Sequence, residues 1–309
     1  MKLVVNGLSV LLDGMPLVEE FSISLEAGRV HAVVGESGSG KTLSALAVLG
    51  LLPEGAQTRG SAQRGGVELL TAPAPLRRAG ISMVLQEPLS ALNPVLSVGN
   101  QLIETLAVHR TPGDLREAAI ALLGEVGIPQ GAERLGMFPH QLSGGQRQRV
   151  SIACALAARP EVLIADEPTT SLDASMRGVI LSLLRKLARD RGMAVWLITH
   201  DLHAVRGSAD EVTVMYAGRV VEQGPARRLL EQPRHPYTVA LLASNPSAAK
   251  VGVPLPTLEG SVPLAREVIA GCRFHPRCPR VIERCRSERP VFQDGVACPL
   301  ANELSGKAG

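Results

Sequence analysis

Short, uninterrupted hydrophobic stretches alternate with longer segments of helical spacing through the first 230 residues of the chain. The stretches at residues 29–35, 161–168 and 194–200 have the pattern of parallel strands that are buried on both faces. Residues 42–52 and 178–192 have the spacing and length of helices, and the second of them carries basic residues near its end. This alternation predicts an α/β fold with a mostly parallel sheet.

Three regions depart from that rhythm. Residues 1–30 are predicted to form antiparallel strands with a turn in the DGMP segment, and residues 88–157 are predicted to be mostly helical. Residues 211–224 predict a hairpin. Frequent prolines follow, and we expect there a short helix at 237–243 and then an irregular linker. We therefore divide the chain into a main domain, residues 1–235, and a C-terminal extension, residues 236–309.

The composition narrows the possible functions. Hydrophobic residues make up 45% of the 309 residues and aromatic residues only 2%, so the core must be built from Ala, Val, Leu and Ile. A formal net charge of +3 is too small to indicate a nucleic-acid partner. The N-terminal sequence lacks the features of a signal peptide, and no run of 18 apolar residues predicts a membrane span. We expect a soluble, cytosolic chain that acts at a membrane only through partners.

The segment GESGSGKT, residues 35–42, follows a predicted strand and precedes a predicted helix. It fits the pattern G-x-x-x-x-G-K-[ST], in which the backbone N–H groups of a glycine-rich loop surround phosphate oxygens. Lys41 is expected to reach the β- and γ-phosphates, and Thr42 to ligate Mg²⁺. A chance glycine-rich turn is the alternative, which the strand–loop–helix context disfavours. The predicted ATP-binding residues are Gly35, Glu36, Ser37, Gly38, Ser39, Gly40, Lys41 and Thr42.

Two further segments extend the site. Asp166 and Glu167 end a hydrophobic stretch, and phosphoryl transfer needs one group that holds Mg²⁺ and another that orients the attacking water. A helix N-cap is the alternative for such a pair. The segment LSGGQRQRV, residues 142–150, places Ser143 at a helix N-cap and forms a second anion site. Two anion sites and one nucleotide predict a head-to-tail dimer in which each ATP lies between two subunits.

These motifs together resemble those of ATP-binding-cassette (ABC) ATPases, over about residues 1–235. The resemblance implies a P-loop NTPase (RecA-like) core, an antiparallel β subdomain, a helical signature subdomain and bound ATP with Mg²⁺. It implies that Asp166 and Gln86 contact Mg²⁺, that Gln86 also senses the attacking water, and that Glu167 is the catalytic base. His200 matches the switch histidine that contacts the γ-phosphate, and Asp173 lies in the loop that contacts the dimer partner. The signature residues that act on the partner's ATP are Ser143, Gly144, Gly145 and Gln146.

One position departs from the family pattern. The family usually places an aromatic residue near position 12 to stack on adenine, whereas this chain has Leu11 and Leu12 and no aromatic residue before Phe21. Apolar contact can still hold the base, but stacking on a ring is lost.

Other segments resemble one branch of the family, the oligopeptide, dipeptide and nickel importers. They are residues 86–102, residues 235–244 and the cysteine-containing C-terminus. The resemblance implies a heterodimer with a second ATPase subunit, two transmembrane permeases, an extracytoplasmic substrate-binding protein and a place on the cytoplasmic face of a bacterial or archaeal membrane. A nickel, metal-chelate or glutathione cargo is the alternative to a peptide. A soluble ATPase of DNA repair or translation is less well supported, because such proteins usually carry long coiled coils or two cassettes.

Four of the five cysteines lie within 27 residues near the C-terminus, separated by five, six and twelve residues. Four thiolates can hold a [4Fe–4S] cluster or a tetrahedral Zn²⁺ ion. The long, uneven spacings and the surrounding arginines favour the cluster, and the family resemblance points the same way. Free thiols and a structural Zn²⁺ are the alternatives. The predicted ligands are Cys272, Cys278, Cys285 and Cys298.

Overall fold

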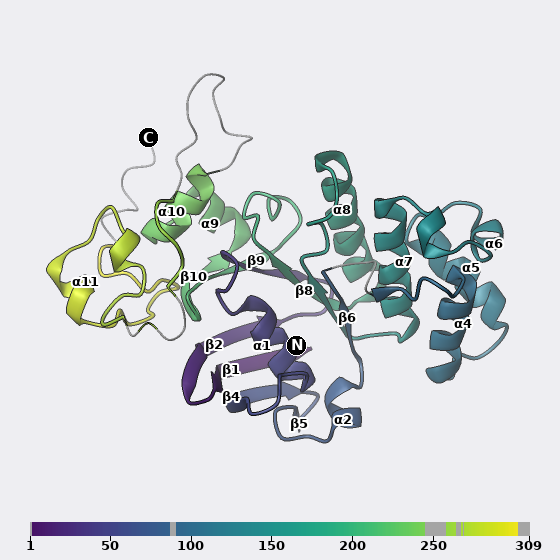
Figure 1. Cartoon of the computed structure of the whole chain (residues 1–309), viewed down its shortest axis with the longest axis horizontal. Coiled ribbons are helices and arrows are strands. Elements are labelled where there is room, and N and C mark those ends of the chain that lie inside the picture. Colours follow the sequence, from purple (N-terminus) through teal and green to yellow (C-terminus); the bar gives the residue numbers. More distant parts are fainter. Residues whose placement is uncertain (1, 87–90, 245–257, 264–266, 268, 302–309) are drawn as a thin grey trace.

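The structure is a computed structural model that describes residues 2–86, 91–244, 258–263, 267 and 269–301. In these residues the strands form one long sheet in the order β5-β4-β1-β2-β10-β9-β3-β8-β7-β6. A group of helices lies at one end of the molecule, and a segment rich in turns lies at the other (Figure 1). We call that segment, residues 269–301, the Cys-rich segment.

The centre of the sheet is parallel. Its strands are β3 (Val30–Val34), β6 (Ile81–Val84), β7 (Val162–Asp166), β8 (Ala194–Thr199) and β9 (Glu211–Tyr216). Strand β10 (Arg219–Pro225) returns antiparallel to β9. The central strands must therefore be covered by helices on both faces, as the hydrophobic stretches in the sequence indicate.

Alternate residues of the central strands enter two separate hydrophobic cores. In β8, Trp196 and Ile198 pack into one core, while Val195 and Leu197 pack into the other. Side chains on a strand point to opposite faces in turn, so a strand between two cores needs a hydrophobic residue at every position. This explains why β7 and β8 read as continuous hydrophobic runs.

A smaller antiparallel region joins the central sheet at one edge. It contains β1 (Leu3–Leu12), β2 (Met15–Leu25), β4 (Gln57–Arg64) and β5 (Val67–Glu68). A parallel pairing of Arg219 with Glu19 connects it to β10. Helix α1 (Lys41–Leu49) lies against this region, and its buried residues share a core with those of β1 and β2.

Helices cover the face of the central sheet opposite α1, and helices form one end of the molecule in Figure 1. Helix α8 (Ala174–Arg191) packs against β8. The other α-helices of the described residues are α2 (Ala74–Arg78), α4 (Val98–Val108), α5 (Leu115–Glu125), α6 (Gly131–Arg134), α7 (Gly144–Ala157), α9 (Ala226–Glu231), α10 (Pro236–Ala243) and α11 (Glu283–Ser287).

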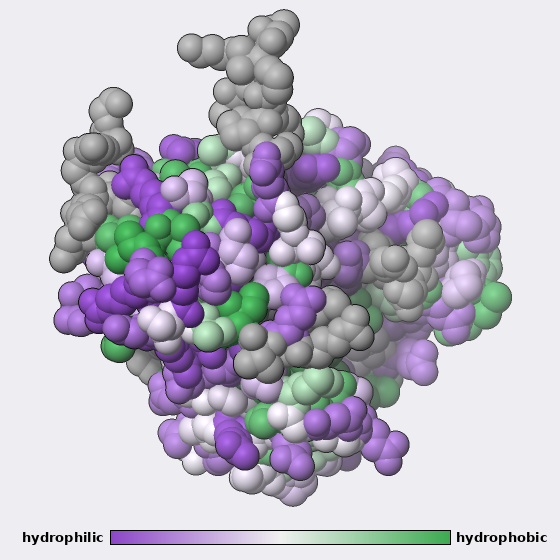
Figure 2. Space-filling view, turned by 60° about the vertical axis from the view of Figure 1, so that its left-hand side comes forward, coloured by the Kyte–Doolittle hydropathy of each residue, from purple (hydrophilic) through white to green (hydrophobic). Residues whose placement is uncertain are grey.

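One buried aromatic ring anchors the Cys-rich segment to the rest of the chain. Phe274 is 1% exposed and makes edge contacts with the rings of Tyr216 in β9 and Tyr237 in α10, at centroid distances of 5.1 and 5.3 Å. The face that carries the segment is largely hydrophilic, with small hydrophobic areas between charged side chains (Figure 2). A buried aromatic contact within polar surroundings therefore helps to hold the segment in place.

The structure confirms the predicted α/β class, the antiparallel N-terminal strands, the parallel central strands and the hairpin of β9 and β10. Between residues 91 and 157, which exclude the undescribed residues 87–90, the described chain contains helices and no strand. The sequence reading missed β4, β5 and β6, because β4 is mostly polar and the other two are short. The division of the chain at residue 235 stays a prediction.

Replacing Phe21 by alanine should lower the free energy of unfolding by about 3–5 kcal/mol, because the ring is fully buried and its loss leaves a cavity. Phe21 stacks on Trp196 with ring centroids 5.7 Å apart, between β2 and β8. Phe292→Ala is the matched control, since that ring is 44% exposed. Urea unfolding followed by tryptophan fluorescence measures both. Equal losses in the two variants would contradict this account of the core.

Candidate nucleotide-binding site

The predicted catalytic residues follow the carboxyl ends of three neighbouring parallel strands. Pairing of Val34 with Thr199 aligns the ends of β3 and β8, and pairing of Asp166 with Ile198 aligns β7 with β8. The phosphate loop follows β3, Glu167 follows β7 and His200 follows β8. Ligands of such sheets bind at this edge, where the loops converge.

The loop at residues 35–40 curls tightly before α1 begins. Gly40 has φ +96°, a left-handed conformation that favours glycine, and it is the N-cap of the helix. A Cβ atom on Gly35 would collide with the backbone carbonyl oxygen of Met215. Lys41 folds back over the loop, and its Nζ donates to the carbonyl oxygens of Gly35 at 2.7 Å and Glu36 at 2.9 Å. Burial lowers the pKa of Lys41, although nearby carboxylates oppose the shift.

A cavity of about 570 Å³ opens over this loop. It brings together most of the predicted phosphate loop and residues from the ends of the next strands, whereas the predicted residues Gly35 and Asp166 are not part of its lining. Its lining consists of Glu36, Ser37, Gly38, Ser39, Gly40, Lys41, Thr42, Leu43, Gln86, Glu167, Thr170 and His200.

Three oxygen-bearing side chains could hold a magnesium ion, since Thr42 and Gln86 line the cavity and Asp166 is bonded to Thr42. Thr42 Oγ1 donates to Asp166 Oδ1 at 3.0 Å, which shows that these two oxygens can share one cation. Burial raises the pKa of Asp166, and the charge of Glu167 adds to the shift, while the bond from Thr42 opposes it. A hydroxyl, a carboxylate and the amide of Gln86 are hard oxygen ligands of the kind that Mg²⁺ selects. The residues present therefore fit this ion.

Glu167 is held by two hydrogen bonds at the mouth of the cavity. Its Oε2 accepts from Thr170 Oγ1 at 2.7 Å and contacts His200 Nδ1 at 2.6 Å. Burial would raise the pKa of Glu167, but the bonds from His200 and Thr170 outweigh it and lower the pKa. The same bond raises the pKa of His200 above 6.5. A carboxylate that accepts two hydrogen bonds is a weaker base than one that accepts none.

The signature residues lie outside the cavity that holds the phosphate loop. Ser143 is the N-cap of α7, and Ser143 and Gln146 each accept a hydrogen bond from the other's backbone N–H, at 3.3 and 3.0 Å. Gly144 and Gly145 form the first turn of that helix, and a Cβ on Gly145 would meet Met176 of α8. Asp173 caps α8 through a bond from the Met176 N–H at 2.9 Å. The second anion site therefore cannot serve this chain's own phosphate loop in the arrangement seen.

The four C-terminal cysteines are free thiols that lie near one another. The Cys272 N–H donates to the Cys285 carbonyl oxygen at 2.9 Å. Burial raises the pKa of Cys298 to about 11, and the other three thiols contribute to the shift. Among the described residues, however, no three His, Cys, Asp or Glu side chains are placed so that they could hold a metal ion. The structure therefore does not support the predicted [4Fe–4S] or Zn²⁺ ligand set.

No aromatic ring of the described residues takes the place of the adenine-stacking residue that the resembled family usually has. Phe21 is buried in the core, and the lining of the cavity contains no Phe, Tyr or Trp among the described residues. Thr170, Tyr237 and Arg277 were not predicted as site residues, yet each binds a residue of the cavity. Thr170 lies only three residues after Glu167, so the sequence itself could have indicated this contact. Tyr237 and Arg277 lie far from Glu36 in the sequence, and nothing near them indicates the contact.

Comparison with known proteins first gives the class. Residues 18–170 match the sequence family described as ABC transporter. The solved structure of cbiO1 from Clostridium perfringens, part of the ABC transporter complex cbiONQ, has a TM-score of 0.65 at 27% identity and covers 74% of this chain and 89% of its own. A dimeric post-hydrolysis state of the ATP-binding cassette MJ0796, bound to ADP and Pi, gives 0.62 at 25% identity, covering 73% and 99%. The fold is that of an ABC ATPase.

The C-terminal part and the most similar relatives give the particular family. Residues 221–285 match the family described as Oligopeptide/dipeptide transporter, C-terminal region. The oligopeptide transport ATP-binding protein OppD of Salmonella typhimurium is 42% identical over 297 residues, which cover 93% of this chain and 89% of that protein. The dipeptide transport ATP-binding protein DppD of Escherichia coli is 45% identical over 282 residues, covering 89% and 86%. The chain belongs to the ATP-binding proteins of oligopeptide and dipeptide ABC transporters.

Replacing Glu167 by glutamine should lower the pKa of His200 toward 6.5, because the carboxylate that stabilises the imidazolium is removed. In the unchanged chain this pairing stabilises the fold fully below pH 6.5 and is lost as the pH rises through the raised pKa of His200. NMR titration of the imidazole protons measures both values. An unchanged His200 titration would contradict the pairing.

Proposed function

We propose that the chain is the ATP-hydrolysing subunit of a peptide importer, and that it binds MgATP in the cavity over residues 35–42. The observation that carries the proposal is the convergence of a phosphate-binding loop, an oxygen site for Mg²⁺ and a Glu–His pair in one cavity. Phosphoryl transfer needs these three components: charge neutralisation, a metal and a group that positions water.

In the proposed reaction, Lys41 leaves the loop carbonyls and binds the β- and γ-phosphates. Thr42, Asp166 and Gln86 hold Mg²⁺, which neutralises charge on the phosphate oxygens when it is bound. His200, which contacts Glu167 in the structure, then contacts the γ-phosphate. Glu167, once released from His200, orients the attacking water and accepts its proton. The water oxygen bonds to the γ-phosphorus while the bond from the γ-phosphorus to the bridging β-phosphate oxygen breaks, so that ADP leaves and phosphate is formed.

The active unit in this proposal is a head-to-tail heterodimer with a second ATPase subunit. Ser143, Gly144, Gly145 and Gln146 lie at the start of α7, outside the chain's own cavity, and are free to bind the γ-phosphate held by the partner. Asp173 contacts the partner across the same interface. The helix N-terminus attracts the anion.

We further propose two permeases as membrane partners, a substrate-binding protein that delivers the cargo to them, and a position on the cytoplasmic face of the membrane. No helix among the described residues is long and apolar enough to cross a membrane. The peptide cargo rests on the names of the relatives, which are oligopeptide and dipeptide transport ATP-binding proteins. A nickel, metal-chelate or glutathione cargo is the alternative to a peptide. The identity of the substrate-binding protein that works with this chain, and of its bound ligand, distinguishes these cargoes.

Glu167→Gln should abolish ATP hydrolysis by the assembled transporter at this subunit's phosphate loop, while ATP binding is retained. The amide cannot accept a proton from water but leaves the loop and the Mg²⁺ ligands in place. Turnover of ATP and equilibrium binding of ATP are the two measurements, with the partner subunit carrying its own inactivating substitution. Unchanged turnover would show that Glu167 is not the catalytic residue.

A metal in the Cys-rich segment is a separate proposal, supported by the presence of four cysteines within 27 residues of the sequence. We propose that they bind a [4Fe–4S] cluster, with Zn²⁺ as the alternative. Anaerobically purified protein is expected to be brown and to contain iron and sulfide. Cys285→Ser should lose the metal, whereas Cys154→Ser, which alters the cysteine outside the segment, should retain it. Protein that contains neither iron nor zinc would contradict the proposal.

A further inference from the structure

The Cys-rich segment reaches the phosphate loop through one arginine. Arg277 makes a two-pronged ion pair with Glu36, the second residue of the loop, with Nη1–Oε2 at 2.8 Å and Nη2–Oε1 at 3.1 Å. The Arg277 side chain is 5% exposed and that of Glu36 is 30% exposed. An arginine–carboxylate pair of this geometry is among the stronger polar contacts in proteins because two parallel charge-assisted bonds form at once.

Arg277 is itself fixed by its surroundings. Its Nε donates to the Glu259 carbonyl oxygen at 2.9 Å, and its Nη2 donates to that of Leu258 at 3.3 Å. The guanidinium lies over the ring of Tyr216, 5.7 Å from its centroid. The bond to Glu36, followed by that to Tyr216, raises the pKa of Arg277, so the side chain stays charged. The guanidinium is therefore positioned before any nucleotide binds.

The backbone of Glu36 is held as firmly as its side chain. Its N–H donates to the hydroxyl of Tyr237 in α10 at 2.9 Å, and its carbonyl oxygen accepts from Lys41 Nζ at 2.9 Å. Tyr237 is fully buried and contacts Phe274 of the Cys-rich segment. One loop residue thus joins the phosphate-binding lysine to the C-terminal part of the chain.

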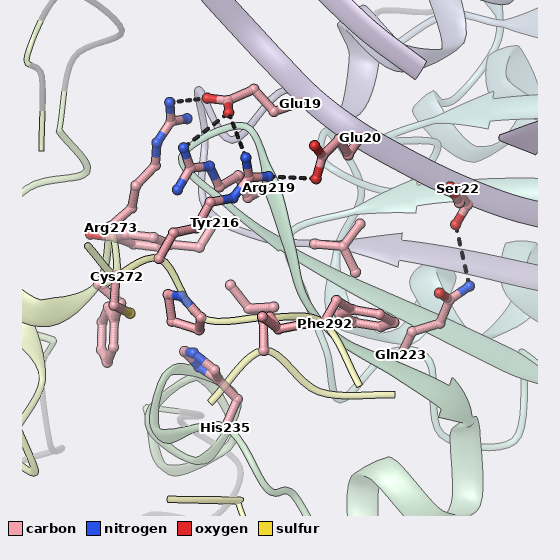
Figure 3. Close-up of a pocket in the computed structure, with 17 residues that line it drawn as sticks. Glu19, Glu20, Ser22, Tyr216, Arg219, Gln223, His235, Cys272, Arg273 and Phe292 are labelled. Carbon is pink, nitrogen blue, oxygen red and sulfur yellow. Dashed lines mark hydrogen bonds and ion pairs between the residues drawn. The ribbon is translucent and has the colours of Figure 1, made fainter. Parts of the chain in front are cut away.

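A second path leads from the segment to the loop through Arg273, which directly follows Cys272. Arg273 donates to the Ala217 carbonyl oxygen and to Glu19, and Figure 3 shows Arg219 and Arg273 pointing toward that carboxylate. The next residue of the turn, Gly218, donates its N–H to the Ser39 carbonyl oxygen at 3.0 Å. The stretch from Cys272 to Cys278 therefore contacts the phosphate loop directly through Arg277 and indirectly through Arg273.

The charge of Glu36 indicates how these contacts affect ATP binding. A carboxylate that lines the cavity repels the phosphates of ATP unless an opposite charge neutralises it. We propose that Arg277 is a positioning residue of the nucleotide site, which neutralises Glu36 and makes the affinity for ATP depend on the placement of the Cys-rich segment. The inference rests on the proposed function, because it assumes that ATP occupies the cavity over residues 35–42.

The test compares equilibrium binding of MgATP to the whole chain and its variants. Arg277→Gln should weaken binding about tenfold, the effect of one unpaired charge near a partly exposed anion site. The double variant Glu36→Gln/Arg277→Gln removes the unpaired carboxylate and should bind within about threefold of the unchanged chain. Arg284→Gln is the matched control, since Arg284 lies in the same segment and pairs locally with Glu288. It should bind ATP normally.

The outcomes separate the possible failures. Rescue by the second substitution supports the charge mechanism, because a purely structural role of Arg277 would leave the double variant as weak as the single one. Equal weakness of the two variants, or normal binding by Arg277→Gln, would overturn the inference. Should Arg277→Gln fail to fold, Arg277→Lys keeps the charge without the paired geometry, and its binding must then fall between those of the unchanged chain and Lys41→Ala. Lys41→Ala must lose ATP binding, and if it does not, the proposed function itself fails.

Discussion

The parallel pairing of β3, β7 and β8 is the constraint on which the nucleotide site depends. It brings the carboxyl ends of three strands to one edge, so that residues separated by more than 150 positions line one cavity. The two hydrophobic cores on either side of the sheet keep these strands in register. A shift of one residue in β8 would turn Trp196 toward the opposite core and move His200 away from Glu167.

The contacts of the site pair its polar groups with one another. Lys41 binds loop carbonyls, Thr42 and Asp166 bind each other, and Glu167 is engaged by His200 and Thr170. In the proposed reaction, phosphate, Mg²⁺ or water replaces one partner in each of these bonds. The bonds keep buried polar groups paired, which limits the cost of holding them ready, and ATP binding exchanges one set of partners for another.

The sequence predicts the local parts of this design well. The strand–loop–helix context of residues 35–42, the serine N-cap at Ser143 and the hydrophobic stretches before Asp166 and His200 are each encoded over a few residues. Contacts that join distant segments leave no such signal, and Arg277 and Tyr237 are examples, since nothing near them in the chain indicates Glu36. Strands β5 and β6 escape prediction because they contain few residues, and their places depend on pairing with neighbours.

The central claim is that this chain supplies one half of each of two composite sites, its phosphate loop to one nucleotide and its signature residues to the other. The structure of the Glu167→Gln chain, assembled with its partner ATPase subunit and MgATP, tests this most directly. The account predicts one ATP that contacts residues 35–42 of this chain and the partner's signature, and a second ATP that contacts Ser143 and Gly145. A nucleotide bound entirely within one subunit, with residues 143–146 remote from any phosphate, would contradict it.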